Sequence, residues 1–199
     1  MHPNSKLLFE KYAKQHFQPN LKVLEIGPDS SPSSYQVITT ASAATWDTVD
    51  FPRKFPLTHT LDSEYSFPIP TDSYDIVLSG QVLEHVRKIW RWMPEVARVC
   101  KPGGLVITIN PVSWPYHEAP VDCWRIYPEG MRALYDDAGL EVMTSVWESL
   151  ELKHFKRGFP GRSPEDQHPT IRRVFSILGK FGFPAERAYD TVTIGRKRL

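Results

Sequence analysis

Two short runs of this sequence are apolar almost without a break, and they limit the possible folds more than any other feature. The runs are Tyr74–Ser79 (YDIVLS) and Leu105–Asn110 (LVITIN). Such runs are typical of strands in a parallel sheet, because helices cover both faces of that sheet. A helical pattern at Arg87–Cys100 lies between the runs, and Lys101–Gly104 (KPGG) is expected to end it. The alternation predicts an α/β fold with a mainly parallel sheet.

The remaining sequence supplies further elements of both kinds. Helices are expected at Ser5–Phe17, which Pro19 ends, and at Pro128–Ala138, which Gly139 ends. Further strands are expected at Leu21–Gly27, Thr45–Phe51, Leu57–Leu61, Glu141–Leu152 and Tyr189–Gly195. Ligands of such sheets bind at the carboxyl ends of the strands, so residues at those ends are the first candidates for a site.

The composition indicates a globular protein. Of 199 residues, 41% are hydrophobic and 24% are charged, and we expect a single domain over residues 1–199. The 2 cysteines are too few for a disulfide framework and the N-terminus lacks an apolar signal-peptide core, so we expect a cytoplasmic protein. No run approaches the roughly 20 apolar residues of a membrane span. The formal net charge of +1 argues against a general nucleic-acid-binding protein.

A glycine turn follows the first predicted strand. In Val23–Ser30 (VLEIGPDS), Gly27 would let the backbone approach a ligand, with N–H groups facing that ligand. The segment lacks the glycines of the G-x-G-x-x-G dinucleotide fingerprint and the Gly-Lys-Ser/Thr of a P-loop. Taken alone, a strand-to-helix turn without a ligand explains it equally well.

Polar residues also follow the next predicted elements. Asp50 ends the second strand, where an acidic side chain can accept hydrogen bonds from both ribose hydroxyls, or can cap the loop before Pro52. Three further segments contain turns at the ends of elements: Leu61–Val77, Ser79–Val86 and Arg98–Leu105. A polar pair at the start of the first of these can meet the exocyclic amine of an adenine.

These five segments, in this order and spacing, resemble the class I S-adenosylmethionine-dependent methyltransferases, especially the Methyltransf_11-like group. The resemblance covers roughly residues 21–152. It implies a Rossmann-like three-layer sandwich with a seven-stranded, mostly parallel sheet whose last strand is antiparallel, a place that Tyr189–Gly195 fits. It also implies that S-adenosylmethionine is the cofactor.

The resemblance implies roles for particular residues. Glu25 and Gly27 match the first motif, which borders the methionine end and the ribose, and Asp50 matches the residue that holds the ribose hydroxyls. Phe51 could line the adenine. The adenine-contacting pair is matched by Asp62 and Ser63, and the strand end beneath the methionyl group by Ser79, Gly80 and Gln81. The family usually has further glycines where Pro28–Ser30 stands here, and Asp29 is a candidate partner of the amino group.

Catalytic residues are expected on the loop Pro111–Arg125, which resembles a loop of methyltransferases from sugar and natural-product pathways. A methyl sulfonium is already an activated electrophile, so the protein must align the acceptor, remove its proton and exclude water. His117 is our first candidate for the general base, with a purely structural bond to a backbone carbonyl as the alternative. Asp122 could orient His117, bind an acceptor hydroxyl or pair with Arg125, and the pairing is favoured.

We expect no metal site. Glu118, His117 and Asp122 form the set that could ligate a metal, but Pro120 prevents one continuous helical face and the spacing matches no metal motif. His85 is as compatible with core packing as with catalysis. Aromatic residues of the loop could wall an acceptor pocket or belong to the core: Trp114, Tyr116 and Trp124.

The charge is unevenly distributed along the chain. Residues 1–150 carry 13 basic and 18 acidic side chains, whereas residues 151–199 carry 11 and 5. The acidic part suits a cofactor with a sulfonium and an ammonium, and the basic part favours an anionic acceptor or an acidic partner surface. An insertion at 153–187 is expected to form a lid or an oligomer contact, with Lys156, Arg157, Arg172 and Arg173 among its charges.

The sequence therefore predicts an enzyme that transfers a methyl group from S-adenosylmethionine to an oxygen of a small molecule, with a sugar or natural-product intermediate as one candidate class. An N-methyltransferase and a non-catalytic, cofactor-binding partner subunit stay open as alternatives. Methylation of RNA or protein lacks support, because Asn110-Pro111-Val112 only partly matches an N-P-P-Y tetrapeptide. No nucleic-acid partner is expected, and a homodimer stays open.

Overall fold

The computed structural model describes residues 3–118, 120–150 and 188–199, together with residues 170, 174, 177 and 181. Seven strands form one sheet in the order β3-β2-β1-β4-β5-β7-β6. Their bounds are β1 Lys22–Ile26, β2 Thr45–Asp50, β3 His59–Thr60, β4 Tyr74–Gly80, β5 Cys100–Pro111, β6 Leu140–Glu148 and β7 Asp190–Lys197.

The strand directions confirm the predicted fold class. The pairs β3·β2, β2·β1, β1·β4 and β4·β5 are parallel, and β7 runs antiparallel to both β5 and β6. Because β1 lies between β2 and β4, the chain reverses its direction of travel across the sheet at this strand. Such a switch point is where open α/β sheets bind their ligands.

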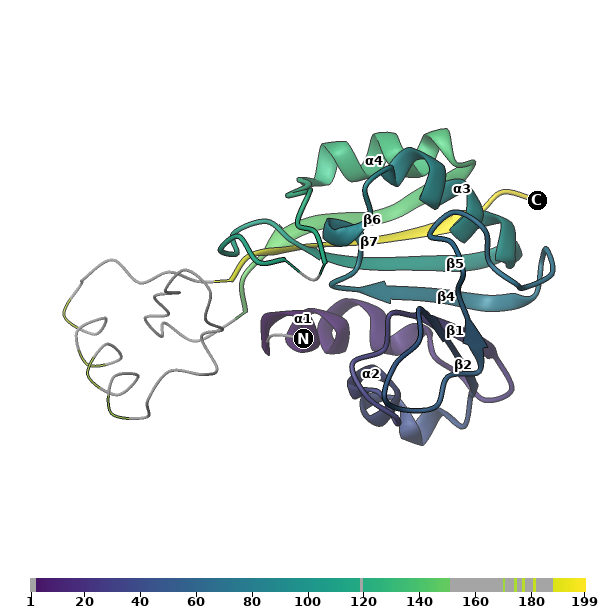
Figure 1. The fold of residues 1–199 in the computed structure, drawn as a ribbon, viewed down its shortest axis with the longest axis horizontal. Coiled ribbons are helices and arrows are strands. Elements are labelled where there is room, and N and C mark those ends of the chain that lie inside the picture. The colour runs from purple at the N-terminus through teal and green to yellow at the C-terminus, as the bar shows by residue number, and fades with distance from the viewer. Residues whose placement is uncertain are drawn as a thin grey trace.

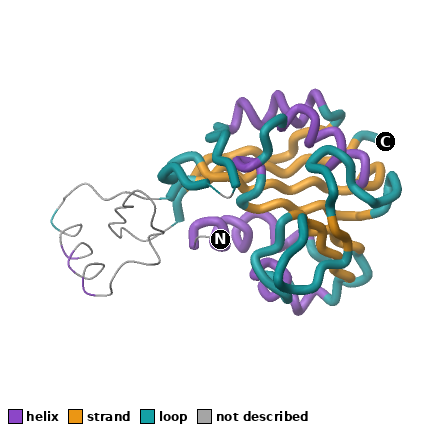
Figure 2. The backbone as a smooth tube through the Cα atoms, viewed as in Figure 1, coloured by secondary structure: helices purple, strands orange, loops and turns teal. Residues whose placement is uncertain are grey.

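Helices cover both faces of the sheet, as Figures 1 and 2 show. On one face lie α1 (Pro3–Leu8), continued by helical turns to His16, and α2 (Ser34–Ile38). On the other lie α3 (Ile89–Val99) and α4 (Pro128–Asp137). Each face has its own buried apolar cluster, so the three predicted layers are present.

The segment Lys101–Gly104 differs from the prediction. We expected it to end a helix, but it belongs to the start of β5, and the pairing with β4 shifts from Tyr74↔Cys100 to Ile76↔Leu105. The bulge absorbs the extra residues. A side chain cannot replace glycine at position 104, where a Cβ would lie 2.8 Å from the Asp75 carbonyl oxygen.

Two further predictions lie partly or wholly outside the described residues. Strand β6 ends at Glu148, four residues before the expected end at Leu152. Residues 151 and 152 are not described. Most of the expected insertion at 153–187 is not described either, including Lys156, Arg157, Arg172 and Arg173. Within the described part of the chain, no helix is both long and apolar enough to cross a bilayer.

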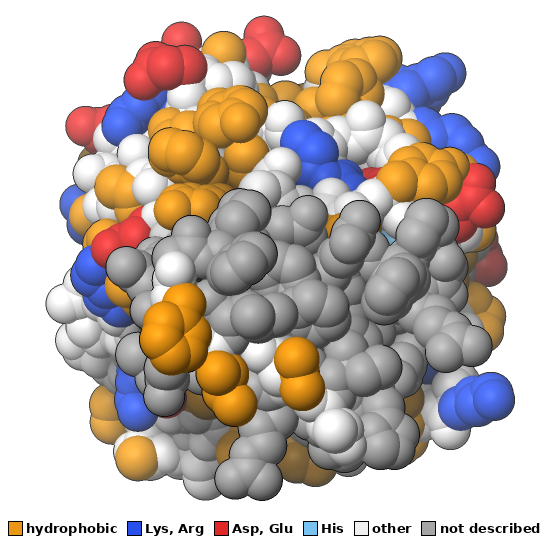
Figure 3. Space-filling view, turned by 90° about the vertical axis from the view of Figure 1, so that its left-hand side faces the viewer, with side chains coloured by type: hydrophobic (Ala, Val, Ile, Leu, Met, Phe, Trp, Pro, Cys, Tyr) orange, Lys and Arg blue, Asp and Glu red, His pale blue; other side chains and the backbone are white. Residues whose placement is uncertain are grey.

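The end of the sheet where β6 ends and β7 begins exposes aromatic side chains. Trp147 of β6 stacks on Tyr189 with ring centroids 4.8 Å apart, and it also meets Tyr127 edge to face. Tyr127 and Trp147 are about half exposed. Figure 3 shows hydrophobic and basic side chains close together on this end of the molecule.

The buried carboxylate of Asp190 ties the N-terminal helix to the sheet. Nδ2 of Asn4 donates to Oδ2 of Asp190 at 2.5 Å and to the Glu148 carbonyl at 3.1 Å, and the Leu150 N–H donates to Oδ1 of Asn4 at 2.7 Å. On the other carboxylate oxygen, Nε2 of Gln81 donates at 3.1 Å. One residue of the first helix thus joins the ends of β6 and β7.

A second buried carboxylate, that of Glu25 on β1, holds the turn after this strand. Oε2 of Glu25 accepts hydrogen bonds from the Ser33 hydroxyl and, at 2.8 Å, from Nε1 of Trp46. The Ser33 hydroxyl in turn accepts a bond from the Gln36 N–H and so caps α2. Burial raises the pKa of Glu25 to about 7, although the two hydrogen bonds act to lower it.

We expect Asn4→Ala to lower the free energy of unfolding by at least about 2 kcal/mol, because it leaves several buried polar groups without a partner. Urea denaturation measures this loss. Gln15→Ala is the matched control, because its exposed amide donates a single bond to the Tyr12 carbonyl. A loss below about 0.5 kcal/mol, the range of ordinary surface substitutions, would contradict the role assigned to Asn4.

We expect Glu25→Gln to flatten the pH dependence of stability. The folded chain holds the Glu25 proton up to about pH 7, well above the ordinary carboxyl pKa of 4.5, so wild-type stability falls as pH rises through this window. The loss is on the order of 3 kcal/mol at most. Urea melts between pH 5 and 8 measure it, with the exposed Glu141→Gln as control; an unchanged slope in Glu25→Gln would refute the assignment.

Candidate active site

A cavity of about 470 Å³ lies at the carboxyl ends of β1, β2 and β4. This is the range of small-molecule sites in proteins. The lining comes from the ends of β1 and β2, the segments after β2, β3 and β4, one residue of α3 and one of the loop after β5: Ile26, Gly27, Asp50, Phe51, Pro52, Arg53, Leu61, Glu64, Gln81, Val82, His85, Val86, Arg87, Trp92 and Pro120.

Two residues with left-handed backbone shape the floor of the cavity. Gly27 has φ +71° and its N–H donates to the Val49 carbonyl at 3.0 Å; a Cβ here would collide with the Val82 side chain. Gln81 has φ +59°, and its N–H donates to the Ile109 carbonyl at 2.8 Å. Glycine is therefore required at the end of β1, where the backbone and Val82 come close.

Asp50 and Phe51 line the cavity at the end of β2. Asp50 is 8% exposed, and its carboxylate accepts from the Phe51 N–H at 2.7 Å and from Nε of Arg53 at 2.6 Å. A carboxylate has about four lone-pair positions, so acceptor capacity is left for a ligand hydroxyl. The Phe51 side chain is 41% exposed beside it.

Of the residues predicted to bind cofactor, the structure brings four together: Gly27, Asp50, Phe51 and Gln81. Asp62 and Ser63 lie in the turn between the cavity-lining Leu61 and Glu64 but do not line the cavity themselves. The remaining three side chains have other surroundings. A role for any of these residues in cofactor binding stays a prediction.

Those three are Glu25, Asp29 and Ser79. Glu25 is directed to Ser33 and Trp46, so it supports the turn from beneath. Asp29 accepts from the N–H and hydroxyl of Ser34 at 2.9 and 2.6 Å; its partial burial opposes ionisation, but these bonds prevail and lower its pKa. Ser79 is buried, and its hydroxyl has no hydrogen-bond partner within the described ranges.

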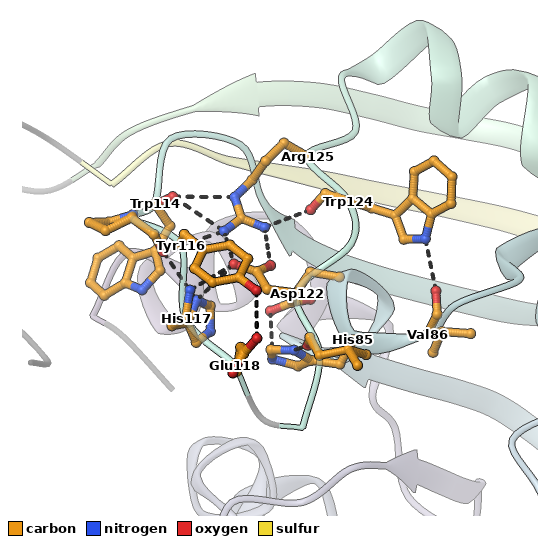
Figure 4. A network of polar contacts seen from close by, with 12 residues as sticks. His85, Val86, Trp114, Tyr116, His117, Glu118, Asp122, Trp124 and Arg125 are labelled. Carbon is orange, nitrogen blue, oxygen red and sulfur yellow. Dashed lines mark hydrogen bonds and ion pairs between the residues drawn. The ribbon is translucent and has the colours of Figure 1, made fainter. Parts of the chain in front are cut away.

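The loop after β5 is braced by an ion pair (Figure 4). The two terminal nitrogens of the Arg125 guanidinium, Nη1 and Nη2, donate to the Asp122 carboxylate at 2.5 and 2.6 Å. The His117 N–H donates to the same carboxylate at 2.8 Å. Nε1 of Trp124 donates to the Val86 carbonyl at 2.8 Å, away from this pair. The structure thus contains the pairing favoured for Asp122, and a catalytic role for Asp122 stays a prediction.

His117 is partly exposed on this loop, with 39% of its side chain accessible. Its Nδ1 lies 3.2 Å from the Pro115 carbonyl and 3.5 Å from Oδ2 of Asp122. Burial lowers the pKa of His117, although the carbonyl and Asp122 act to raise it. The imidazole is therefore neutral at neutral pH and can accept a proton.

A cluster of three potential ligands was not predicted: donor atoms of Glu84, His85 and His117 all lie within 4.8 Å of one another. Glu84 and His85 belong to the helical turn Leu83–His85 before α3, and the two histidine rings meet edge to face at 5.0 Å. The signal in the sequence was the adjacent pair Glu84-His85 between the apolar residues of Val82–Val86 (VLEHV). Glu118 instead bonds the Tyr116 hydroxyl at 2.7 Å and lies outside this cluster.

The two cysteines and the aromatic residues have ordinary surroundings. Burial raises the pKa of the Cys100 thiol to about 12, which makes it a poor nucleophile. Trp92 is buried at the cavity wall, whereas Trp90 is half exposed and meets Trp124 edge to face at 6.0 Å. Tyr116 is 68% exposed, so it is not a core residue.

Comparison with known families matches residues 26–108 to the Methyltransf_11 model, described as a methyltransferase domain. An uncharacterized methyltransferase of Mycobacterium bovis (strain BCG / Pasteur 1173P2) is 49% identical over 45 residues, which is 23% of this chain and 18% of that protein. One of Mycobacterium ulcerans (strain Agy99) is 44% identical over 45 residues, again 23% and 18%. The aligned part thus spans less than a fifth of these relatives.

Solved structures share the fold over nearly the whole chain. A SAM-dependent methyltransferase from Archaeoglobus fulgidus has a TM-score of 0.61 at 16% identity, covering 96% of this chain and 92% of that one. Geranyl diphosphate methyltransferase in complex with SAM has a TM-score of 0.60 at 12% identity, covering 96% and 84%. The [4+2]-cyclase SpnF has a TM-score of 0.61 at 16% identity, covering 98% and 80%.

Three observations point to the same kind of fold: the strand order, the position of the cavity and the matched domain. Residues 26–108 thus match a methyltransferase domain, and the fold of the chain is similar to that of SAM-dependent methyltransferases of known structure.

Proposed function

We propose that the chain binds S-adenosylmethionine in the cavity and transfers its methyl group to an oxygen of a small-molecule acceptor. The main support for the proposal is that Gly27, Asp50 and Gln81 line one cavity, although they come from the ends of three neighbouring strands. Its position at the switch point of the sheet is where this class of fold holds ligands.

Different residues along the cavity can bind different parts of the cofactor, from the ribose and adenine to the methionyl end. Asp50 accepts the ribose hydroxyls while it keeps its bond with Arg53, because lone pairs are left on both oxygens. Phe51 offers an exposed ring to the adenine. The methionyl end then lies toward Gln81 and Val82, which places the reactive methyl group on the side of His85.

Methylation of oxygen is favoured by the groups that lie at that end. A hydroxyl acceptor must lose its proton as the methyl group arrives, and the neutral imidazole of His117 is a candidate base. His117 lies against His85, which lines the cavity. Sugars and natural-product intermediates carry such hydroxyls, and the basic C-terminal part of the sequence favours an anionic member of this class.

A cofactor-binding subunit without catalytic activity is the second candidate. The [4+2]-cyclase among the structural neighbours is named for a different reaction, so the fold alone does not fix methyl transfer. The two candidates differ in turnover. A methyltransferase converts labelled S-adenosylmethionine into labelled product when it meets its acceptor, whereas a binding subunit does not.

We expect Asp50→Asn to weaken S-adenosylmethionine binding by at least about tenfold, because a charge-assisted hydrogen bond contributes about 1.5–3 kcal/mol. Isothermal titration calorimetry measures the affinity. Asp136→Asn is the matched control, since Asp136 is an exposed carboxylate of α4 that pairs with Arg198. Equal affinity in wild type and Asp50→Asn would refute the assignment of this cavity to the cofactor.

Turnover is measured by incubating the chain with methyl-labelled cofactor and pooled small-molecule hydroxyl and amine acceptors. We expect labelled ethers or esters rather than labelled amines, and a lower yield with Asp50→Asn at subsaturating cofactor. Labelled amines would instead establish the N-methyltransferase alternative. Tight cofactor binding without labelled product from any pool would favour the binding subunit.

A further inference from the structure

We infer that Glu84, His85 and His117 form a binding site for a divalent transition metal, with Zn²⁺ as the best-matched ion, at the edge of the cofactor cavity. Two imidazoles and one carboxylate make up the protein ligands of one common type of catalytic zinc site, in which water or substrate takes the fourth position. The three donor atoms lie within 4.8 Å of one another. The sequence analysis expected no such site.

The Glu84 carboxylate is the observation that points to a ligand. Glu84 is 1% exposed, and neither of its carboxylate oxygens has a hydrogen-bond partner in the part of the chain that the structure describes. A buried carboxylate without partners is costly, and folded proteins retain one mainly where a proton or a metal ion satisfies it.

The hydrogen bonds of the two histidines leave Nε2 of each ring available to bind a metal ion. Nδ1 of His85 lies 2.5 Å from the Val121 carbonyl, and Nδ1 of His117 lies 3.2 Å from the Pro115 carbonyl. A carbonyl only accepts, so each Nδ1 carries the proton and each Nε2 keeps its lone pair. Metal-binding histidines typically have this arrangement, in which a backbone carbonyl or carboxylate fixes the tautomer.

The distances require only small adjustments. Nε2 of His85 lies 3.7 Å from Oε1 of Glu84. Zinc–ligand bonds of about 2.0–2.2 Å place neighbouring donors of a tetrahedral site roughly 3.3–3.5 Å apart. His117 is carried by a partly exposed loop whose backbone is held by Asp122, so its side chain can move while the loop stays in place.

The role of this metal in catalysis rests on the proposed function, whereas metal binding itself does not. Of the three ligands His85 lines the cavity, so a metal ion held by this set would lie beside the proposed place of the acceptor. A hydroxyl bound there loses its proton to water more readily. Its oxygen then forms the bond to the methyl carbon, while the electron pair of the sulfur–methyl bond leaves with the sulfur. In this state His117 is a ligand and not the base.

Zinc titration of the tag-free full chain, stripped with chelator and returned to chelator-free buffer, tests the site. Calorimetry gives the affinity, and elemental analysis after gel filtration gives the stoichiometry. We expect one Zn²⁺ per chain, and affinity weakened by at least about tenfold in Glu84→Gln and in His117→Ala. Because His117 is partly exposed, His117→Ala carries the test if Glu84→Gln does not fold.

Glu118→Gln is the matched control, because Glu118 follows His117 in the chain but bonds Tyr116. It should bind zinc like the wild type. The inference is overturned if the chain binds no stoichiometric zinc, if Glu84→Gln and His117→Ala bind like the wild type, or if Glu118→Gln loses as much affinity as they do. Cofactor affinity is measured separately, so a failure of the proposed function leaves the zinc result intact, and the reverse also holds.

Discussion

The buried carboxylate of Asp190 is the interaction on which the arrangement of this molecule depends most. Burial of an ionisable group is tolerated when hydrogen bonds satisfy it. Here they come from Asn4 near the start of the chain and from Gln81 at the end of β4. Asp190 itself begins β7, the antiparallel strand between β5 and β6. One side chain thus fixes the N-terminal helix, a central strand end and the last strand relative to one another.

The carboxylates of Asp122 and Glu84 show how the surroundings decide whether a carboxylate stabilises a loop or stays available for chemistry. Asp122 is fully engaged by Arg125 and by the His117 N–H; burial opposes its ionisation, but these partners prevail and lower its pKa. Glu84 is more deeply buried and lacks such hydrogen bonds within the described residues, and burial raises its pKa. The depth of burial and the partners of each carboxylate tell the two apart, and the sequence shows neither.

The sequence predicted the sheet and the strand ends well, because those depend on local patterns. Apolar runs mark β4 and β5, Gly27 marks a turn that a side chain would block, and Asp50 ends β2 where the cavity lies. The bulge at the start of β5 was missed because KPGG is an equally good helix stop.

The parts of the site that could not be predicted depend on contacts between distant segments. Glu25 matched a cofactor motif, but Trp46, 21 residues away, bonds its carboxylate. His117 meets Glu84 and His85 only because the loop after β5 folds back over the turn after β4.

Gln81, whose backbone is left-handed, takes part in both the cavity and the contact that holds the first helix. Its backbone shapes the cavity, and its side-chain amide donates to the Asp190 carboxylate, which also accepts from Asn4. A side chain in that backbone region costs on the order of 1–3 kcal/mol, which its neighbours must offset. The backbone that shapes the cavity and a contact that holds the first helix in place therefore meet in one residue, so a substitution of Gln81 would disturb both.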